Sequence, residues 1–275
     1  MSATQKEKGE RFRALHEGPG IFVIPNPWDI GSARVLEGLG FPALATSSAA
    51  SAMAMGSKDG MLTREQAVGH GRAIAGATDV PVSADLENGF GDAPESVAET
   101  VRMAAEAGLV GCTIEDSTGR ADKPVYDLEF AAERIAAGAE AARRLGFPFV
   151  LTARAHNLLY ANPSVDEAIR RLQAYERAGA DVLFAPGLPD LAAVRTVCEA
   201  ISRPFNFMVG MKGKSFSVKE LAAAGVKRVS LATSLYRAAM SGLVEAAREV
   251  IESGSFEFVD RSVLTAELLK LMNTE

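Results

Sequence analysis

Eight short apolar runs recur along the 275-residue chain, and each run is followed by a stretch with helical periodicity. The runs are bounded by turn residues and carry apolar side chains on both sides, so we expect parallel strands that are buried on two faces. The expected strands span residues 21–24, 43–46, 80–84, 110–114, 149–153, 182–185, 205–209 and 228–232. This alternation excludes an all-helical or all-β fold and favours an α/β architecture.

The stretches between the runs carry start and stop signals for helices. Capping pairs spaced three residues apart are Thr63 with Gln66, Asp92 with Glu95, Ser164 with Glu167, and Ser217 with Glu220. Five glycines follow helical runs, where a left-handed residue commonly ends a helix: Gly40, Gly108, Gly146, Gly179 and Gly225. Residues 2–17 are expected to form a helix ahead of the first strand.

Eight strand–helix units predict a (β/α)8 barrel of the TIM type, a fold that typically takes about 250 residues. We expect one domain over residues 1–275, with the N-terminal helix before the barrel and residues 255–275 as a C-terminal helical extension. A doubly wound open sheet is the alternative, and the lack of a GxGxxG motif after any strand disfavours it. The apolar C-terminal helix predicts a homo-oligomer, a dimer or tetramer.

Composition and charge exclude several classes of protein. Hydrophobic residues make up 48% of the chain, which excludes a disordered protein, and the formal net charge is −6. Without clustered Lys and Arg we expect no nucleic-acid or membrane partner. No apolar run is long enough to span a bilayer and no signal peptide is evident, so we expect a cytoplasmic protein. Two cysteines, Cys112 and Cys198, predict core thiols and no zinc site.

Ionisable side chains follow three consecutive expected strands. Asp85 and Glu87 come after the third strand, Glu115 after the fourth and Arg154 after the fifth. The carboxyl ends of barrel strands meet at one mouth, where two carboxylates 4 Å apart repel by about 4 kcal/mol at an effective dielectric of 20. A hard divalent cation, Mg²⁺ or Mn²⁺ in its place, offsets this repulsion, and the guanidinium of Arg154 suits a carboxylate ligand. We therefore expect a small anionic acid as substrate.

An ordered set of motifs from about residue 22 to 236 resembles the isocitrate lyase and phosphoenolpyruvate mutase superfamily. The motifs are Pro25–Asp29, Thr46–Ser48, Lys58–Gly60, Asp85–Gly91, Ile114–Asp116 and Thr152–Arg154. The resemblance implies a Mg²⁺-dependent barrel that makes or breaks a bond next to the carbonyl of a 2-oxo acid. The reaction would pass through a pyruvate-like enolate.

The resemblance also implies roles for individual residues. Metal ligands are Asp85, Glu87 and Glu115, and catalytic residues are Asp59, Glu115 and Arg154. The substrate would be bound by Ser47, Ser48, Ala49, Asp85, Arg154 and Asn206, with Trp28 as a wall of the pocket. His156 lies two residues after Arg154, so its side chain is expected on the same side of the strand, and it is a further candidate for the pocket.

One departure from the superfamily narrows the expected reaction. Isocitrate and methylisocitrate lyases carry a Lys-Cys-Gly-His loop after the fourth strand, whereas residues 117–124 read Ser-Thr-Gly-Arg-Ala-Asp-Lys-Pro and contain no cysteine. We expect carbon–carbon bond cleavage, by a lyase or hydrolase, in an oxaloacetate-like or substituted malate-like dicarboxylic acid. The alternatives are a phosphonate mutase or hydrolase and a catalytically inactive binding barrel. Residues 117–126 are expected to form a mobile gate over the site.

Overall fold

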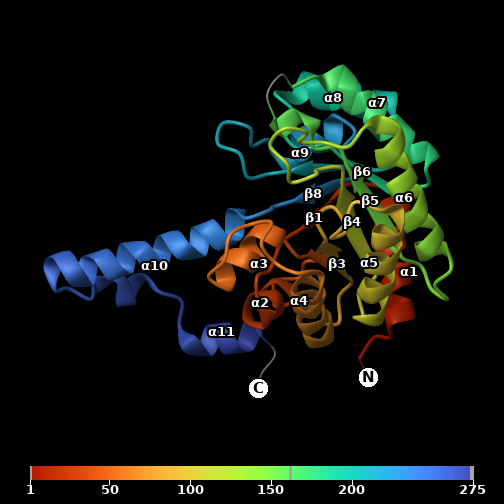
Figure 1. The fold of residues 1–275 in the computed structure, drawn as a ribbon. Coiled ribbons are helices and arrows are strands. Elements are labelled where there is room, and N and C mark those ends of the chain that lie inside the picture. Colours follow the sequence, from red (N-terminus) through yellow and green to blue (C-terminus); the bar gives the residue numbers. More distant parts are fainter. Residues whose placement is uncertain (1, 161–162, 273–275) are drawn as a thin grey trace.

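Eight parallel strands form a nearly closed barrel in the computed structural model, which describes residues 2–160 and 163–272 (Figure 1). The strands are β1 (Phe22–Ile24), β2 (Leu44–Ala45), β3 (Val82–Asp85), β4 (Gly111–Glu115), β5 (Val150–Arg154), β6 (Val182–Phe184), β7 (Phe205–Met208) and β8 (Arg228–Ser230). Each is paired in parallel with its neighbours in the order β1-β8-β7-β6-β5-β4-β3-β2. Between β2 and β1, the N–H of Ala45 donates to the carbonyl of Pro25 over 3.0 Å. The predicted barrel is confirmed, with strand ends shifted by at most two residues.

Helices follow the strands and cover the outside of the barrel. The α-helices are α1 (Gln5–Glu17), α2 (Ile30–Gly38), α3 (Ser48–Ala54), α4 (Arg64–Ala77), α5 (Pro94–Glu106), α6 (Leu128–Arg143), α7 (Val165–Arg177), α8 (Leu191–Ala200), α9 (Val218–Ala223), α10 (Ser234–Ser253) and α11 (Thr265–Leu271). Two short 3₁₀ helices are η1 (Asn157–Leu159) and η2 (Glu257–Arg261). No helix in the described residues has the length and apolar character needed to cross a membrane.

The predicted N-terminal helix closes the amino end of the barrel. Phe12 of α1 is fully buried in a cluster with apolar side chains of the barrel interior, among them Val110 and Val150. Gly111 makes this packing possible, because a Cβ at this position would lie 2.9 Å from Cε1 of Phe12 and 2.7 Å from the carbonyl oxygen of Val150. Helix α1 therefore blocks this end of the barrel and leaves the carboxyl end for a site.

Two of the predicted helix boundaries are wrong. Helix α5 begins at Pro94 with Ala93 as its N-cap, and Asp92 does not cap it. Proline is favoured at the first helical position, and the carboxylate of Asp92 instead accepts hydrogen bonds from Tyr126 and Arg120 in the segment after β4. Gly40, Gly108, Gly179 and Gly225 do adopt positive φ, whereas Gly146 does not, because α6 already ends at Arg143.

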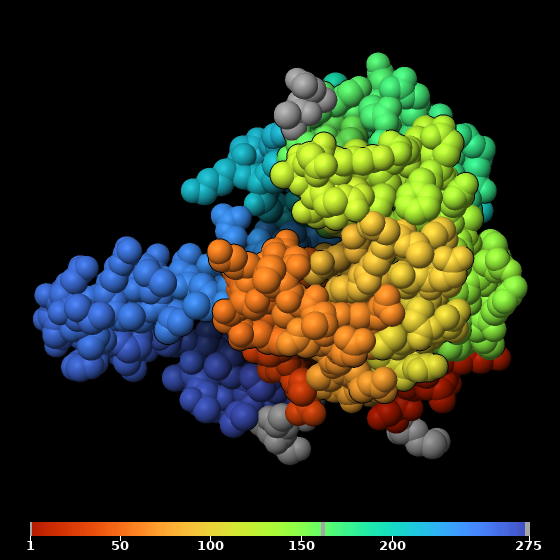
Figure 2. Space-filling model, viewed as in Figure 1, coloured from red at the N-terminus to blue at the C-terminus, as the bar shows by residue number. Residues whose placement is uncertain are grey.

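The C-terminal region leaves the barrel and then returns to it. Helix α10 projects away from the barrel without a buried residue, and the chain turns back so that α11 packs on α2 (Figures 1 and 2). The contact is close at Gly38, where a Cβ would lie 1.9 Å from the carbonyl oxygen of Leu271. The predicted C-terminal helix is confirmed, but the length and projection of α10 were not anticipated by the sequence analysis.

Buried His16 makes the stability of this fold dependent on pH. Its Nδ1 lies 2.8 Å from the carbonyl oxygen of Phe12, and burial, together with nearby Arg228, lowers its pKa from 6.5 to about 3. The native state therefore holds a neutral imidazole, and its contribution is complete above pH 6.5 and is lost as the pH falls toward 3. At pH 5 we expect this group alone to cost about 2 kcal/mol in the free energy of unfolding.

The substitution His16→Gln tests this prediction, because glutamine offers a donor and an acceptor without a titratable group. Urea unfolding at pH 7 and pH 5 should show a loss of stability on acidification that is about 2 kcal/mol smaller in the variant than in the parent protein. Equal losses in the two proteins would show that His16 does not carry the effect.

Candidate active site

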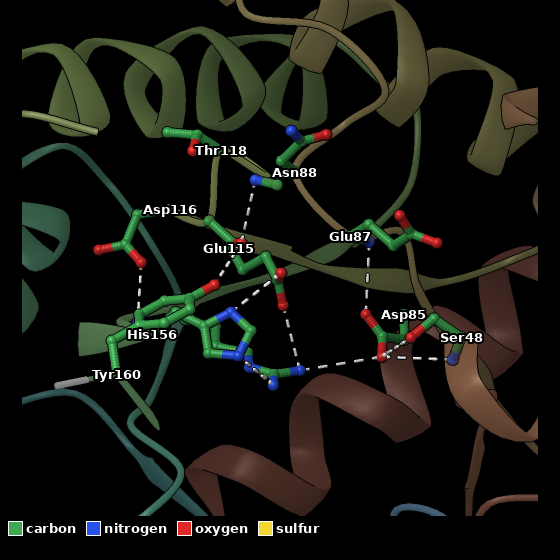
Figure 3. Close-up of polar contacts among 12 residues, drawn as sticks. Ser48, Asp85, Glu87, Asn88, Glu115, Asp116, Thr118, His156 and Tyr160 are labelled. Carbon is green, nitrogen blue, oxygen red and sulfur yellow. Dashed lines mark hydrogen bonds and ion pairs between the residues drawn. The ribbon is translucent and has the colours of Figure 1, made fainter. Parts of the chain in front are cut away.

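Three ionisable side chains from neighbouring strands meet at the carboxyl mouth of the barrel (Figure 3). Asp85, Glu115 and Arg154 are the last residues of β3, β4 and β5, and Glu115 is directly paired in register with Arg154. Nη1 of Arg154 lies 3.2 Å from Oε2 of Glu115 and 3.9 Å from Oδ2 of Asp85. Their side chains are only 12–17% exposed. The structure thus brings together the three strand-end residues singled out in the sequence.

The electrostatic environment differs between the carboxylates. Burial raises the pKa of Asp85, and nearby Glu115 and Asp59 add to this effect against the opposing influence of Arg154. Burial also opposes ionisation of Glu115, but Arg154 and His156 outweigh it and lower the pKa of this carboxyl group. Glu115 is therefore the ionised partner of Arg154, while Asp85 shares the same guanidinium at the longer distance of 3.9 Å.

Two cavities open at this mouth and share Ser48, Asp59 and Arg154 as lining residues. The deep cavity, inside the barrel, has a volume of about 220 Å³, and the outer cavity has a volume of about 580 Å³. In the space-filling view the surface is hollowed between the orange segment containing α3 and the yellow-green segment after β4 (Figure 2). The deep cavity can hold only a small molecule, and it opens into the larger outer cavity.

The predicted carboxylate-binding loop lies at the start of α3. The hydroxyl of Ser47 caps this helix by accepting from the N–H of Ala50, and Ser47, Ser48 and Ala49 all line the deep cavity. The Ser48 hydroxyl lies 3.1 Å from Oδ2 of Asp85, and its N–H lies 3.4 Å from the same oxygen. This loop is therefore tied to the acid at the end of β3.

Glu87 lines the outer cavity with a strained backbone. Its φ of 49° is in the left-handed region, which non-glycine residues seldom adopt and which is costly where it occurs. Its N–H, rather than its carboxylate, faces Asp85, with the N–H nitrogen 3.3 Å from Oδ1 (Figure 3). Burial, together with Asp85, Asp59 and Glu115, raises the pKa of Glu87 to about 7.

His156 joins the site through both ring nitrogens. Nδ1 lies 3.0 Å from Oε1 of Glu115, and Nε2 lies 3.1 Å from Nη2 of Arg154 (Figure 3). Beside it, the hydroxyl of Tyr160 lies 2.9 Å from the Ser117 hydroxyl, and all of these side chains line the outer cavity. His156 was predicted for the pocket because it lies two residues after Arg154, on the same side of the extended chain. Tyr160 follows the 3₁₀ helix η1, where the sequence has no periodic pattern that would indicate it.

Two of the remaining predicted site residues line a cavity, and Trp28 does not. Asn206 of β7 lines the deep cavity, and Asp59 is exposed at the rim of both cavities. Trp28 instead packs edge-on against Tyr236, with ring centroids 5.5 Å apart, and is not among the described residues that line either cavity. Cys112 is fully buried in the core, as predicted.

The donor chemistry of the site fits a hard divalent cation. The acids at the mouth offer only oxygen ligands, and burial, with a smaller effect of the neighbouring acids, raises the pKa values of Asp85 and Glu87. A bound cation would favour their ionised forms. Among residues 2–160 and 163–272, however, no three His, Cys, Asp or Glu side chains are placed to share one ion. Mg²⁺ commonly binds one or two carboxylates and keeps several waters, which is the arrangement that Asp85 allows here.

Residues 12–251 match the model of the phosphoenolpyruvate phosphomutase family. The chain belongs to this family. A solved structure from Burkholderia cenocepacia J2315, named only to the level of a lyase/mutase, is 50% identical, covers 96% of this chain and 95% of its own, and has a TM-score of 0.94. A probable 2-methylisocitrate lyase of Corynebacterium glutamicum is 30% identical over 97% of this chain and 88% of its own. An oxaloacetate decarboxylase of Bradyrhizobium diazoefficiens is 28% identical over 96% and 91%.

The family includes carbon–carbon lyases as well as mutases, so membership leaves the reaction of this chain open. The segment after β4 forms an isolated antiparallel bridge between Ser117 and Val125, and Arg120 in this segment pairs with Asp92. Mobility of this gate segment stays a prediction.

A buried network behind the site holds the loop after β5. The carboxylate of Asp116 accepts from the N–H of His156 over 2.7 Å, from Nη1 of Arg171 over 3.0 Å and from the hydroxyl of Tyr175. Asp116 is 3% exposed, so this carboxylate depends on these donors instead of water. The network therefore fixes the backbone from which His156 reaches Glu115.

Replacing Asp116 by alanine should lower the free energy of unfolding by about 3 kcal/mol, because three buried donors lose their acceptor, although Arg171 keeps its ion pair with Glu167 at 2.9 Å. Asp127→Ala is the matched control, since Asp127 forms an exposed ion pair with Lys123 and should change stability by about 1 kcal/mol or less. Denaturant unfolding measures both. Similar stabilities for the two variants would contradict the role assigned to the network.

Proposed function

We propose that this protein is a Mg²⁺-dependent carbon–carbon lyase or hydrolase that acts on a small 2-oxo or 2-hydroxy dicarboxylic acid. The observation that carries the proposal is the meeting of Arg154 with Glu115 and Asp85 at the point where the two cavities join. Similarity to an oxaloacetate decarboxylase and a probable 2-methylisocitrate lyase supports carbon–carbon chemistry. The absence of a cysteine from residues 117–124 favours oxaloacetate-like or substituted malate-like substrates over methylisocitrate.

Asp85 would hold the cation, with Glu87 and Glu115 reaching it through water. When bound, the cation would polarise the 2-oxo group of the substrate and stabilise the negative charge that develops on its oxygen. Glu87, whose pKa is about 7, would have to lose its proton to take part in this shell. Cation affinity would therefore increase as the pH rises through this value.

The chain's own residues would bind and orient the substrate. The Ser47–Ala49 loop would grip one carboxylate and Arg154 the other anionic end, with Glu115 fixing the plane of the guanidinium. Asp59, which is exposed at the rim of both cavities, would exchange a proton between the substrate and solvent. His156 would hold Glu115 in its ionised form, and Asn206 would bind from the deep cavity.

A substrate screen tests the proposed reaction. Purified protein with Mg²⁺ should release pyruvate or a carboxylate from oxaloacetate or an alkylated malate, and EDTA should abolish the activity. Asp85→Asn should reduce kcat by about a hundredfold or more without unfolding the protein, because this residue supplies the charge at the centre of the site. Arg154→Lys should raise KM by about tenfold, since a point charge replaces a two-pronged donor.

Glu140→Gln, which breaks an exposed ion pair with Arg144 and lines neither cavity, is the control and should keep the parent activity. Turnover of phosphonopyruvate alone would support the phosphonate alternative. Absence of turnover together with absence of Mg²⁺-dependent oxalate binding would favour the inactive binding barrel.

We also propose that the protein forms a homo-oligomer through its C-terminal arm, residues 234–272. Helix α10 has no buried residue, and large apolar side chains on the arm are exposed, among them Leu243 (58%), Ile251 (82%) and Leu264 (73%). Met53 of α3 and Met240 and Val244 of α10 line one further groove along this helix. A second copy of the chain would bury these surfaces.

The double substitution of Leu243 and Ile251 by glutamate should convert the oligomer into monomers, because charge on the arm opposes its burial. Val218→Glu is the control, since Val218 is also exposed (44%) but begins α9, outside the arm. Sedimentation velocity measures the masses. A parent protein that sediments as a monomer, or a double variant that keeps the parent mass, would refute the proposal.

A further inference from the structure

A buried arginine lies at the floor of the deep cavity, below the residues already described. Arg228 is the first residue of β8, is only 4% exposed and lines this cavity. Its Nε donates to Oδ1 of Asn206 over 2.8 Å, its Nη2 donates to the Thr152 hydroxyl over 3.0 Å, and its Nη1 lies 3.3 Å from Nε2 of His16. Its one signal in the sequence is a charged residue at the start of the expected strand over residues 228–232.

None of these three partners offsets the charge of the guanidinium. Asn206 and Thr152 are uncharged, and His16 is neutral at physiological pH. Arg228 forms no ion pair with any acid in residues 2–160 and 163–272, and burial lowers its pKa to about 9. A buried charge without a counter-ion is costly to the folded state, so a purely structural role is better filled by a neutral side chain.

Two other buried arginines show the contrast. Arg154 at the same cavity already faces Glu115 and Asp85. Arg134 is 1% exposed and, like Arg228, donates hydrogen bonds to neutral groups, in this case backbone carbonyls. Unlike Arg228, it also stacks on the ring of Tyr126 at 4.3 Å and lies near the carboxylates of Asp92 and Asp116. Arg228 is thus a buried arginine at the deep cavity whose positive charge is available to an anionic ligand in that cavity.

We propose that Arg228 supplies a fixed positive charge beneath the deep cavity and thereby selects ligands with two negative charges over singly charged ones. The inference rests on the proposed function and deepens it, because it assigns to Arg228 the preference of the same site for a doubly charged acid. Arg228 acts over the cavity floor, whereas the Ser47–Ala49 loop and Arg154 bind at the mouth. The Asn206, Thr152 and His16 contacts hold the guanidinium in place, so no reorganisation is needed when the ligand binds.

Oxalate and oxamate form a matched pair of probes, since oxamate replaces one carboxylate of oxalate with a neutral amide. Their dissociation constants are measured by calorimetry with Mg²⁺ present, and the readout is the ratio of oxamate Kd to oxalate Kd. In the parent protein we expect oxalate to bind at least about tenfold more tightly. In Arg228→Met this ratio should fall by about tenfold, whereas Arg228→Lys should retain most of it.

Arg134→Met is the matched control, because it removes a buried arginine that does not line the deep cavity, and it should keep the parent ratio. Arg228→Gln, which can still donate a hydrogen bond, serves if the methionine variant does not fold. A neutral variant that folds and keeps the parent ratio would overturn the inference for Arg228 while leaving the proposed function standing. Failure of the parent protein to bind oxalate with Mg²⁺ would instead overturn the proposed function.

Discussion

The pairing of Arg154 with Glu115 and Asp85 is the interaction on which the site depends. These residues end three adjacent parallel strands, so their backbone positions are fixed by the hydrogen bonds of the barrel and not by a loop. Burial raises the pKa values of Asp85 and Glu87, and the neighbouring acids, which one guanidinium cannot neutralise, add to this effect. A site in which acids outnumber the guanidinium is suited to bind a cation, and the cation and Arg154 together can bind an anionic ligand.

Support for this mouth comes from the layers behind and below it. Asp116, next in the chain to Glu115, points away from the cavities and holds the backbone of His156 through a buried network with Arg171 and Tyr175. Beneath the cavity, Arg228 connects β8 with Thr152 of β5 and with His16 of the helix that closes the amino end. Polar side chains therefore continue below the cavity to Arg228 and His16, next to the apolar cluster of Phe12, Val110 and Val150 at the amino end of the barrel.

Much of the fold and the centre of the site could be predicted from local pattern. Apolar runs located all eight strands to within two residues, because strands covered on both faces need continuous apolar sequence. Asp85, Glu115 and Arg154 were predicted as site residues because they come at the ends of three successive expected strands. The capping prediction at Asp92 failed because a tertiary partner, Tyr126, competes for its carboxylate, and no local pattern reports such a contact.

The sequence by itself determined the barrel, the mouth at which its polar strand ends meet and the family to which its motifs belong. Tertiary structure decided that Trp28 packs on Tyr236 instead of lining a cavity, that α10 projects from the barrel, and that Arg228 lines the deep cavity without an ion pair to any described acid. The physical reason is that periodicity and strand ends are set by neighbours along the chain. Charge compensation and packing depend on residues far apart in sequence, such as His16 and Arg228, whose partnership exists only once the barrel has closed.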